Sequence, residues 1–278
     1  MTRFTARFAG RLGAASLLLA LTGGEASAQP PPPLDRVNLS LGGHYASSDT
    51  NIGARTANDE YSGSLNLEDD LGFQQRKTVP RARLDFLIGD RQGFSFDYFS
   101  VNRSHGRALA RGISYDGNNY DARVAVRGKL DFDFGSASYR WWFGDGNDVF
   151  GLGLGGAWYR VQAGIHGEAS VDGASVGEAA ASTTAHAWAP ELQLGWRHAF
   201  NEHWRMYADA SGVKKNGGRL HGHIYNVDLG VSWYPWDNLG FGAEYGYTRI
   251  KLKQHHASHD EMLDMKLNGP SLFVKFRF

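Results

Sequence analysis

Apolar and polar side chains alternate along most of the chain. In the segment 225–233 the odd positions are apolar or aromatic, and the even positions are Asn226, Asp228, Gly230 and Ser232. A period of two over several residues predicts β-strands that each have one apolar face. No segment shows a convincing helical period. About ten alternating segments are present, at 37–45, 82–88, 94–98, 129–134, 150–158, 188–197, 204–209, 225–233, 241–248 and 271–278.

The connections between these segments fall into two classes. Short stretches with the Gly, Asn, Asp and Pro of tight turns occur at 89–93, 144–148, 201–203 and 235–238. Longer connections lie near 46–78, 104–123, 163–184, 214–219 and 253–264. Short turns at one end and long loops at the other predict an all-β fold, a closed antiparallel transmembrane up-and-down β-barrel of about ten strands. Eight or twelve strands are alternatives, because 104–127 and 160–188 could extend strands above the membrane.

A soluble β-sandwich is the competing fold, since its strands also alternate around a shared core. Charges close to the middle of many strands favour the barrel, because they suit a polar lumen. The tryptophans also gather near predicted strand ends, as the girdles of a membrane barrel do. Five adjoin short turns and two lie toward the long loops: Trp141, Trp142, Trp204, Trp233 and Trp236, then Trp158 and Trp188.

The N-terminal segment has a different pattern. Arg3, Arg7 and Arg11 accompany a short apolar stretch at 12–21, and Ala26-Ser27-Ala28 follows. These are the charged region, the apolar region and the cleavage site of a secretory signal peptide, and the apolar stretch is too short to span a membrane. We therefore predict three parts: a signal peptide at 1–28, a proline-rich periplasmic leader at 29–35, and the barrel at 36–278.

Composition narrows the functional classes. The formal net charge of the 278 residues is +0, whereas a nucleic-acid-binding protein usually has a basic surface. The chain contains no cysteine, which excludes disulfides and thiolate metal sites. We accordingly predict no cofactor, no bound metal and no nucleic-acid partner.

The polar faces of the predicted strands define candidate lumen residues. With each apolar face placed outward, Leu130, Phe132 and Phe134 included, the inward positions carry both signs of charge in nearly equal number. A balanced set predicts ion pairs, whereas a selective pore usually shows a ring of one sign. About ten strands also leave a lumen that side chains can largely fill. The predicted ion-pair network is Arg81, Arg83, Asp85, Asp97, Lys129, Asp131, Asp133, Glu191, Arg197, Arg205, Asp209, Asp228, Glu244, Lys275 and Arg277.

The predicted long loops contain groups with possible chemistry. Acidic pairs and histidines can act as acid–base groups or bind metal, although no zinc-ligand spacing is met. A solvated turn is the favoured explanation of the acidic pair, because no loop of spaced oxygen ligands follows it. Metal binding or pH sensing by the histidines is an alternative. The rim candidates are Asp69, Asp70, His221, His223, His255, His256, His259 and Asp260.

The last eight residues, SLFVKFRF, form an alternating strand that ends on an aromatic residue. Together with the export signal, the alternating strands and the aromatic bands, this strand resembles those of Gram-negative outer-membrane β-barrel proteins. The resemblance implies location in the outer membrane and insertion by the outer-membrane assembly machinery, with Leu272, Val274, Phe276 and Phe278 as the assembly signal. It also implies contact with membrane lipids and lipopolysaccharide, and we expect a monomer.

Basic residues near the predicted outer rim suit the phosphates of lipopolysaccharide. Solvation of the loops is the competing explanation of these charges. The residues are Arg103, Arg107, Arg111, Arg123, Arg127, Lys214, Lys215, Lys251 and Lys253.

Two enzyme families use barrels of this size. Omptin-type proteases carry an acidic pair and an Asp–His pair at the rim, roles for which only Asp69, Asp70, His259 and Asp260 are available here. Lipid A deacylases carry His-x-Ser on a strand, and the string 256–258 has that form but lies in a predicted loop. No complete set of nucleophile, base and orienting group can be assembled.

The sequence therefore predicts an outer-membrane barrel with a structural or surface-interaction role, adhesin-like and in contact with lipopolysaccharide. A surface enzyme, either a protease or a lipid A hydrolase, is the first alternative. A narrow channel for small solutes is the second.

Overall fold

The structure of the protein is a computed structural model. It describes residues 32–56, 62–108, 113–115, 118–120, 125–171, 174–217, 220–255 and 259–278, so the predicted signal peptide lies outside the described residues. No helix among them is long and apolar enough to cross a membrane. The strands are β1 (Val37–Thr56), β2 (Ser62–Asn66), β3 (Arg76–Leu87), β4 (Gln92–Ala108), β5 (Ile113–Tyr115), β6 (Asn118–Tyr120), β7 (Ala125–Phe143), β8 (Asp148–Val171), β9 (Ala174–Ala199), β10 (Trp204–Lys215), β11 (Leu220–Trp233), β12 (Leu239–His255) and β13 (His259–Arg277).

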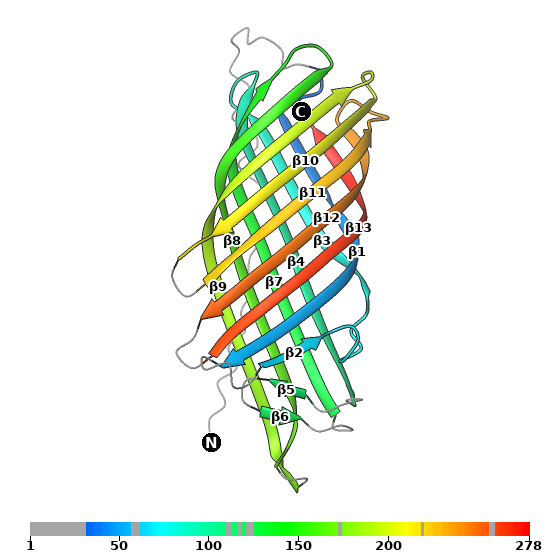
Figure 1. The fold of residues 1–278 in the computed structure, drawn as a ribbon. Helices are drawn as coiled ribbons and strands as arrows, with labels where there is room; N and C mark the ends of the chain where they lie inside the picture. Colours follow the sequence, from blue (N-terminus) through cyan, green and yellow to red (C-terminus); the bar gives the residue numbers. More distant parts are fainter. Residues whose placement is uncertain are drawn as a thin grey trace, which may run out of the picture.

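Ten of these strands form a closed antiparallel barrel, as the alternation predicted (Figure 1). Their order around the barrel is β1, β3, β4, β7, β8, β9, β10, β11, β12 and β13, and β13 pairs with β1 to close the sheet. Closure leaves no edge strand, so the backbone groups of the wall are paired internally. The extra strand β2 adds to the far half of β1, and β5 pairs with β6 as a small separate hairpin.

The two ends of the barrel differ in their connections. Short turns at 88–91, 144–147, 200–203 and 234–238 join strands at one end, where the amide of Phe278 donates to the carbonyl of Val37 (2.9 Å). We call this the short-turn end and the opposite one the long-loop end. In outer-membrane barrels such ends are periplasmic and extracellular, respectively.

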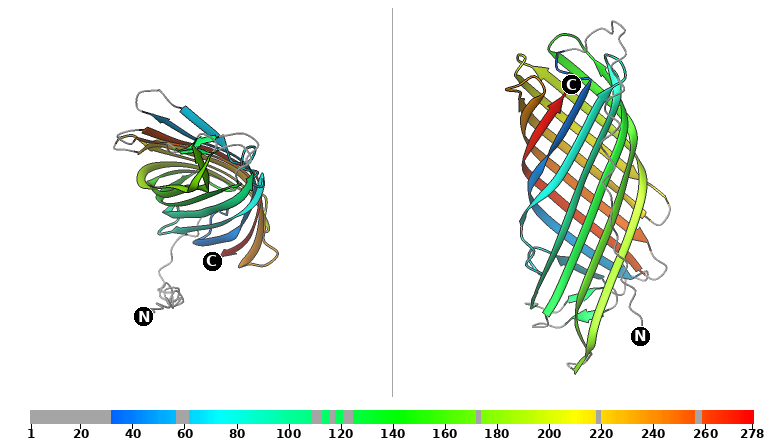
Figure 2. Two further views of the ribbon diagram at one scale, coloured as in Figure 1. Left: turned by 90° about the horizontal axis from the view of Figure 1, so that it is seen from below. Right: turned by 180° about the vertical axis from the view of Figure 1, so that it is seen from behind.

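At the long-loop end much of what the sequence predicted as loop is strand. β1 continues to Thr56, β8 continues to Val171 and β9 begins at Ala174. The hairpin of β8 and β9 reaches farther than its neighbours in two opposite views (Figures 1 and 2). The wall of the barrel therefore extends well beyond a span of nine to eleven residues, which suffices for a tilted strand to cross a bilayer.

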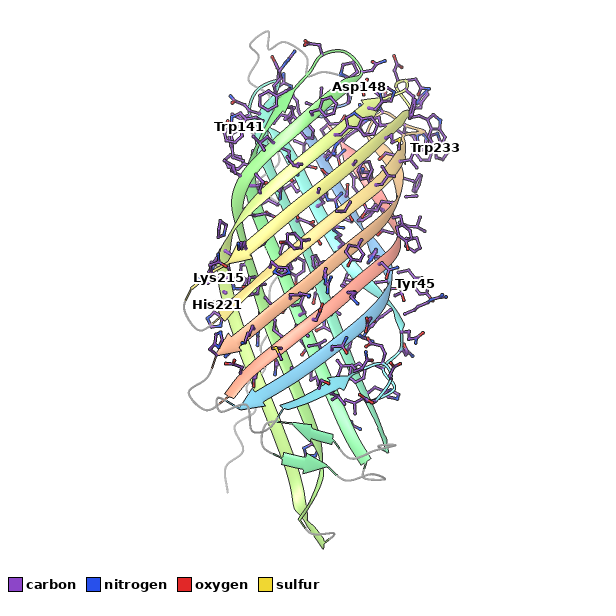
Figure 3. The ribbon with its side chains drawn as sticks, viewed as in Figure 1. Tyr45, Trp141, Asp148, Lys215, His221 and Trp233 are labelled. Atoms are coloured by element: carbon purple, nitrogen blue, oxygen red, sulfur yellow. The ribbon has the colours of Figure 1, made fainter. Side chains whose placement is uncertain are left out.

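A band of apolar side chains covers the outside of the barrel near the short-turn end. Leu154, Val227, Leu229 and Leu272 are each at least half exposed on this face. Two aromatic girdles border the band, as expected at the interfaces of a membrane barrel. By strand position, the short-turn girdle contains Trp141, Phe143, Phe150, Trp204, Trp233, Trp236 and Phe241, and the long-loop girdle contains Tyr45, Tyr98, Trp158, Trp188, Tyr225, Tyr245 and Tyr247. Figure 3 labels Trp141 and Trp233 of the first girdle and Tyr45 of the second.

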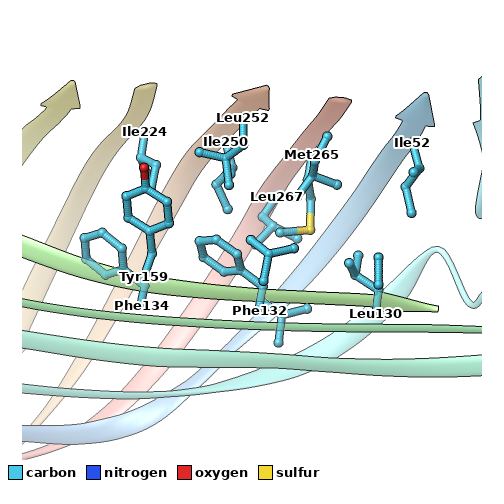
Figure 4. Close-up of a cluster of buried hydrophobic side chains, with 14 of the residues drawn as sticks. Ile52, Leu130, Phe132, Phe134, Tyr159, Ile224, Ile250, Leu252, Met265 and Leu267 are labelled. Carbon is cyan, nitrogen blue, oxygen red and sulfur yellow. The ribbon is translucent and has the colours of Figure 1, made fainter. Parts of the chain in front are cut away.

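The segment 129–134 of β7 has the opposite orientation from that predicted. Leu130, Phe132 and Phe134 have no exposed surface and point into the barrel, where the ring of Phe134 lies 5.0 Å from that of Phe99 (Figure 4). Asp131 and Asp133 are therefore on the outer face. The prediction was wrong because it assumed that hydrocarbon surrounds every strand along its whole length.

Candidate functional site: the filled lumen and the long-loop rim

A layer of paired charges fills the short-turn half of the lumen. Arg81 is at its centre and forms ion pairs with Asp97 (2.6 Å), Asp228 (2.9 Å) and Glu244 (3.3 Å). Arg83, two residues along β3 on the same face, pairs with Asp228 (3.2 Å) and Glu244 (3.5 Å). β3, β4, β11 and β12 thus each contribute to one cross-lumen network, which ties opposite walls of the barrel together.

The network continues around Asp209 of β10. This carboxylate accepts hydrogen bonds from Arg197 at 3.0 and 2.9 Å and from Arg140 at 3.2 Å. The guanidinium groups of Arg140 and Arg197 both lie over the ring of Trp142, at 5.3 and 5.0 Å from its centroid. Gln193 accepts from Arg140 (2.6 Å) and links it to Glu191. Cation–π contacts of this kind stabilise a buried guanidinium in addition to its ion pairs.

An apolar layer fills the long-loop half of the lumen. Its members come from most strands of the barrel and include the aromatic side chains Phe99, Phe132, Phe134 and Tyr159. On the far side of this layer, the turn between β2 and β3 folds inward and buries Leu67, Leu71 and Phe73, among others. We call residues 65–73 the lid. Its apolar side chains join the same core, so the lid closes the long-loop end of the lumen.

A buried ion pair fastens the lid to the wall. Glu68 accepts hydrogen bonds from the amide of Thr50 (2.8 Å) and from the guanidinium of Arg103 (2.5 Å). Arg103 also donates to the carbonyl oxygen of Gln74 (2.6 Å). Arg103 is only 4% exposed, so it belongs to the lumen and not to the basic outer rim where the sequence placed it. The prediction failed because Arg103 lies on the inner parity of a strand that continues past the expected loop boundary.

The short-turn mouth of the lumen is occupied by the chain that precedes β1. Leu34 is buried against Trp142 and Val149. Asp35 accepts hydrogen bonds from Arg205 (2.8 Å) and from Asn38 (2.9 Å). The predicted leader therefore ends inside the barrel mouth.

Two small cavities lie within the described part of the lumen. One has a volume of about 60 Å³ and lies between the mouth and the charged layer, beside Asp85, Arg83 and Lys275. Another has a volume of about 30 Å³ inside the charged layer. A wide pore would require a continuous open path, whereas here three successive layers of side chains fill the lumen.

The predicted lumen residues separate into three groups. Arg81, Arg83, Asp97, Glu191, Arg197, Asp209, Asp228 and Glu244 meet in the charged layer. Asp85, Lys275, Arg205 and Arg277 lie between this layer and the short-turn mouth, where Arg277 lies over the ring of Tyr234 (4.1 Å). Lys129, Asp131 and Asp133 are outside the lumen, and Lys129 pairs there with Asp131 (2.7 Å).

Sequence reasoning missed several members of the lumen. Arg140 shares the even parity of the misassigned segment of β7, so the correct parity of that strand would have found it. Glu68 and Thr50 lie within a predicted loop, where no periodicity marks a side chain as buried. Gln193 alternates with apolar residues in the segment 188–197. It was not recognised as a partner of Arg140, because neutral polar groups do not stand out in a search for charge pairs.

The outer wall at the long-loop end carries a groove with several basic side chains. Its volume is about 510 Å³. Asp264 pairs with Arg249 (3.1 Å) and Lys251 (3.3 Å), whereas Lys214 forms no ion pair or hydrogen bond within the described part of the chain. We call this the basic groove; its lining includes Lys214, His221, His223, Lys251, Lys253 and Met262.

The histidines of the rim are part of this wall. His255 and Asp260 form a hydrogen bond (2.6 Å), and Lys253 pairs with the same carboxylate (2.9 Å). Hydrogen bonds from Lys253 and then His255 lower the pKa of Asp260. The ring of His221 lies 5.2 Å from that of His255. Within the described residues, no three such side chains are grouped as metal ligands would be.

Burial and nearby positive charge lower the pKa of one more rim histidine. His223 lies beyond the long-loop girdle, and its pKa is lowered first by burial and then by Lys251 and Arg249. His256 lies outside the described residues, and the side chain of His259 is likewise not described. Asp70 caps the turn of the lid by accepting from the amide of Asn66 (2.9 Å), and the amide of Asp69 donates to the side chain of Asn66 (2.9 Å).

The C-terminal strand has the orientation that the alternation predicted. Leu272 and Val274 are exposed on the outer face, and Phe278 is 63% exposed at the short-turn end. Phe273, the exception in the pattern, is buried in the lumen beside Gly42. The role of this strand as an assembly signal stays a prediction.

No protein-family model and no curated protein sequence matches the chain. Among solved structures, the outer membrane protease OmpT from Escherichia coli is similar with a TM-score of 0.54 at 11% identity, over 88% of this chain and 97% of that one. The outer membrane protein OprG from Pseudomonas aeruginosa matches at a TM-score of 0.39 and 9% identity, over 89% of this chain and 99% of that one. The likeness to OmpT concerns the fold alone. The chain therefore has the closed ten-stranded β-barrel fold of Gram-negative outer-membrane proteins.

Proposed function

We propose that the protein is an integral outer-membrane barrel that does not conduct solutes and has a structural or surface-interaction role. The apolar outer band between two aromatic girdles supports insertion in a membrane. The long-loop end then stands in the extracellular space, where the basic groove is available to partners. This proposal includes export by the N-terminal segment and assembly through the C-terminal strand.

The filled lumen is the observation that carries the proposal. The lid, the apolar layer, the charged layer and the segment before β1 occupy the lumen in succession. A barrel of this strand number has no spare width once its interior side chains are packed. The protein is therefore poorly suited to be a channel.

Conductance tests this part of the proposal directly. Purified protein inserted in planar bilayers should give no single-channel steps in potassium chloride. A variant in which Arg81 and Arg83 are both replaced by Ser serves as a comparison, because it removes the cationic core of the charged layer. Regular steps from the unmodified protein would overturn the non-conducting function and favour the narrow channel.

The basic groove is the proposed contact for anionic groups on the cell surface. Lys214 has no partner among the described residues, and Lys251 shares Asp264 with Arg249. Arg and Lys side chains bind phosphate groups well, and lipopolysaccharide carries phosphates in its sugar core. We expect a deacylated, phosphorylated oligosaccharide to bind several-fold more weakly to Lys214→Gln than to the unmodified protein. Equal binding to both would contradict this assignment of the site.

A surface enzyme is the second candidate, and the hydrogen-bonded pair of His255 and Asp260 is the observation that favours it. OmpT, whose fold is similar, is an outer membrane protease, so a barrel of this fold can carry an enzymatic activity. Peptide or lipid A turnover by purified protein that is lost in Asp260→Asn would support this candidate. Absence of turnover in the unmodified protein would leave the structural role as the better account.

A further inference from the structure

A second groove lies on the opposite outer wall, within the apolar band. Its volume is about 490 Å³. Gly135 and Ala137 of β7 form its floor, Phe96 and Tyr98 of β4 border it on one side, and Trp158 and Trp188 border it on the other. We call this the acyl groove. It exists because β7 presents two small residues between strands that carry large aromatic side chains.

Gly135 shows how the groove is shaped. A Cβ at this position would lie 3.8 Å from the ring of Tyr98 and 4.0 Å from the ring of Trp158, both ordinary contact distances. The glycine is therefore not required by a close backbone approach, and its backbone is not in the left-handed region. A larger side chain would fit there and would fill the groove.

The groove begins at the long-loop girdle, which marks one interface of the membrane. Tyr98, Trp158 and Trp188 belong to the long-loop girdle, and Trp188 is 68% exposed. From these residues the groove runs toward the short-turn end, as far as Leu39 and Leu84. Its apolar part thus lies in the half of the hydrocarbon layer next to the long-loop interface, which is the outer leaflet in the orientation proposed above.

A cation lies just beyond the aromatic end of the groove. Arg160 follows Trp158 by two residues on the same face of β8, and its nearest positions across the sheet are Asp133 and His186. Arg160 is exposed and forms no hydrogen bond or ion pair with any residue that the structure describes. Asp133 instead accepts a hydrogen bond from Ser100 (2.7 Å).

We propose that the acyl groove and Arg160 together bind a phosphorylated lipid of the outer leaflet, namely lipid A. One acyl chain lies along Gly135 and Ala137 between the aromatic walls, and a phosphate lies on the guanidinium of Arg160 at the interface. A guanidinium binds phosphate through two parallel hydrogen bonds, and an apolar groove bordered by aromatic rings gives a chain more contact than a flat wall does. The inference rests on the proposed membrane location.

The apolar groove alone would also accept part of a second copy of the chain. A stable protein interface buries roughly 1,200–2,000 Å² of total surface, far more than a groove floored by two small residues offers. The cation at the headgroup level fits a lipid phosphate, whereas a like-charged copy would bring another Arg160. A dimer is therefore an outcome to be tested and not the expectation.

The test uses full-length folded protein in detergent and native mass spectrometry with lipid A as the probe. Arg160→Gln should weaken binding about ten-fold, the usual scale for a lost charge-assisted hydrogen bond. Gly135→Leu, which fills the groove, should also weaken it. Two matched controls should bind like the unmodified protein. Lys129→Gln removes a cation of the same wall that Asp131 already pairs, and Ala243→Leu adds nearly the same bulk at another outward position.

Lipid A without phosphates distinguishes the contribution of the acyl groove to binding from that of Arg160. It should bind the unmodified protein and Arg160→Gln equally weakly, and Gly135→Leu should weaken it further. Three results would each overturn the proposal. They are an equal loss of lipid A binding in the two control variants, unchanged lipid A binding by Arg160→Gln, and a dimer that Gly135→Leu abolishes. Heat-modifiability on gels shows that each variant is folded. Failure of the unmodified protein to insert in bilayers would instead reject the membrane function itself.

Discussion

The two halves of the barrel are built on opposite rules. Near the short-turn end, the lumen holds Arg81, Asp97 and Asp228 while the outer face carries side chains such as Leu229. Near the long-loop end, Phe132 is inside and Asp131 is outside. The same continuous strands are therefore apolar outside and polar inside near the short-turn end, and polar outside and apolar inside near the long-loop end.

The surroundings of the wall explain the change. In the membrane, hydrocarbon selects apolar side chains on the outside, and polar side chains must find partners in the lumen. Beyond the long-loop girdle, water surrounds the barrel, so the usual arrangement of a soluble protein applies and apolar residues fill the inside. The apolar layer then gives the protruding part its own hydrophobic core.

The largest effect is expected in the charged layer. Arg81→Ala removes the ion-pair partner of Asp97 and leaves Asp228 and Glu244 with Arg83 alone. Removing one partner of a buried network typically costs about 3–5 kcal/mol. Unfolding in urea, followed by heat-modifiability, would measure the loss. Leu229→Ala on the outer face is the control with a smaller expected effect. A loss for Arg81→Ala no larger than that of the control would show that the charges do not hold the walls together.

A somewhat smaller effect is expected in the apolar layer. Phe132→Ala removes a fully buried ring, and such changes cost about 3 kcal/mol or slightly more in well-packed cores. The same urea titration applies, with Phe150→Ala on the exposed outer face as the matched ring deletion. If the two deletions were equally mild, the long-loop half would have no packed core.

The lid should be less costly to release. Glu68→Ala removes the acceptor of Arg103 and leaves that guanidinium buried, which we expect to cost about 2 kcal/mol. Local opening should appear as faster hydrogen exchange in residues 65–73, with exchange in β11 unchanged. Unaltered exchange in the lid would mean that its apolar contacts alone hold it in place.

The smallest effect is expected on the outer wall. Asp131→Ala removes only a surface ion pair with Lys129, worth under about 1 kcal/mol. The sequence-based assignment of Asp131 to the lumen would instead predict a loss like that of Arg81→Ala. Stability measurements on this variant thus choose between the two orientations of β7.

The sequence predicted the fold class, and the orientation of most strands within the membrane band, because hydrocarbon imposes one rule there. It misassigned Leu130, Phe132 and Phe134 because alternation reports only that two faces differ and does not say which face is inside. It also misplaced Arg103 and did not recognise Glu68 as buried, since their pairing depends on a lid that folds back over the barrel. Alternation weakens in the Ala- and Gly-rich stretch at 163–184, which hid the length of β8 and β9.

Chemical labelling of single cysteines tests most directly whether the polar and apolar faces of the wall exchange sides beyond the long-loop girdle. The chain suits this experiment because it has no cysteine of its own. Asp131→Cys and Val101→Cys place single thiols on neighbouring strands, the first on the outer face and the second in the apolar layer, where Val101 is 1% exposed. In intact cells a membrane-impermeant maleimide should label Asp131→Cys rapidly and leave Val101→Cys unlabelled until the protein is denatured. Rapid labelling of Val101→Cys with protection of Asp131→Cys would contradict the account.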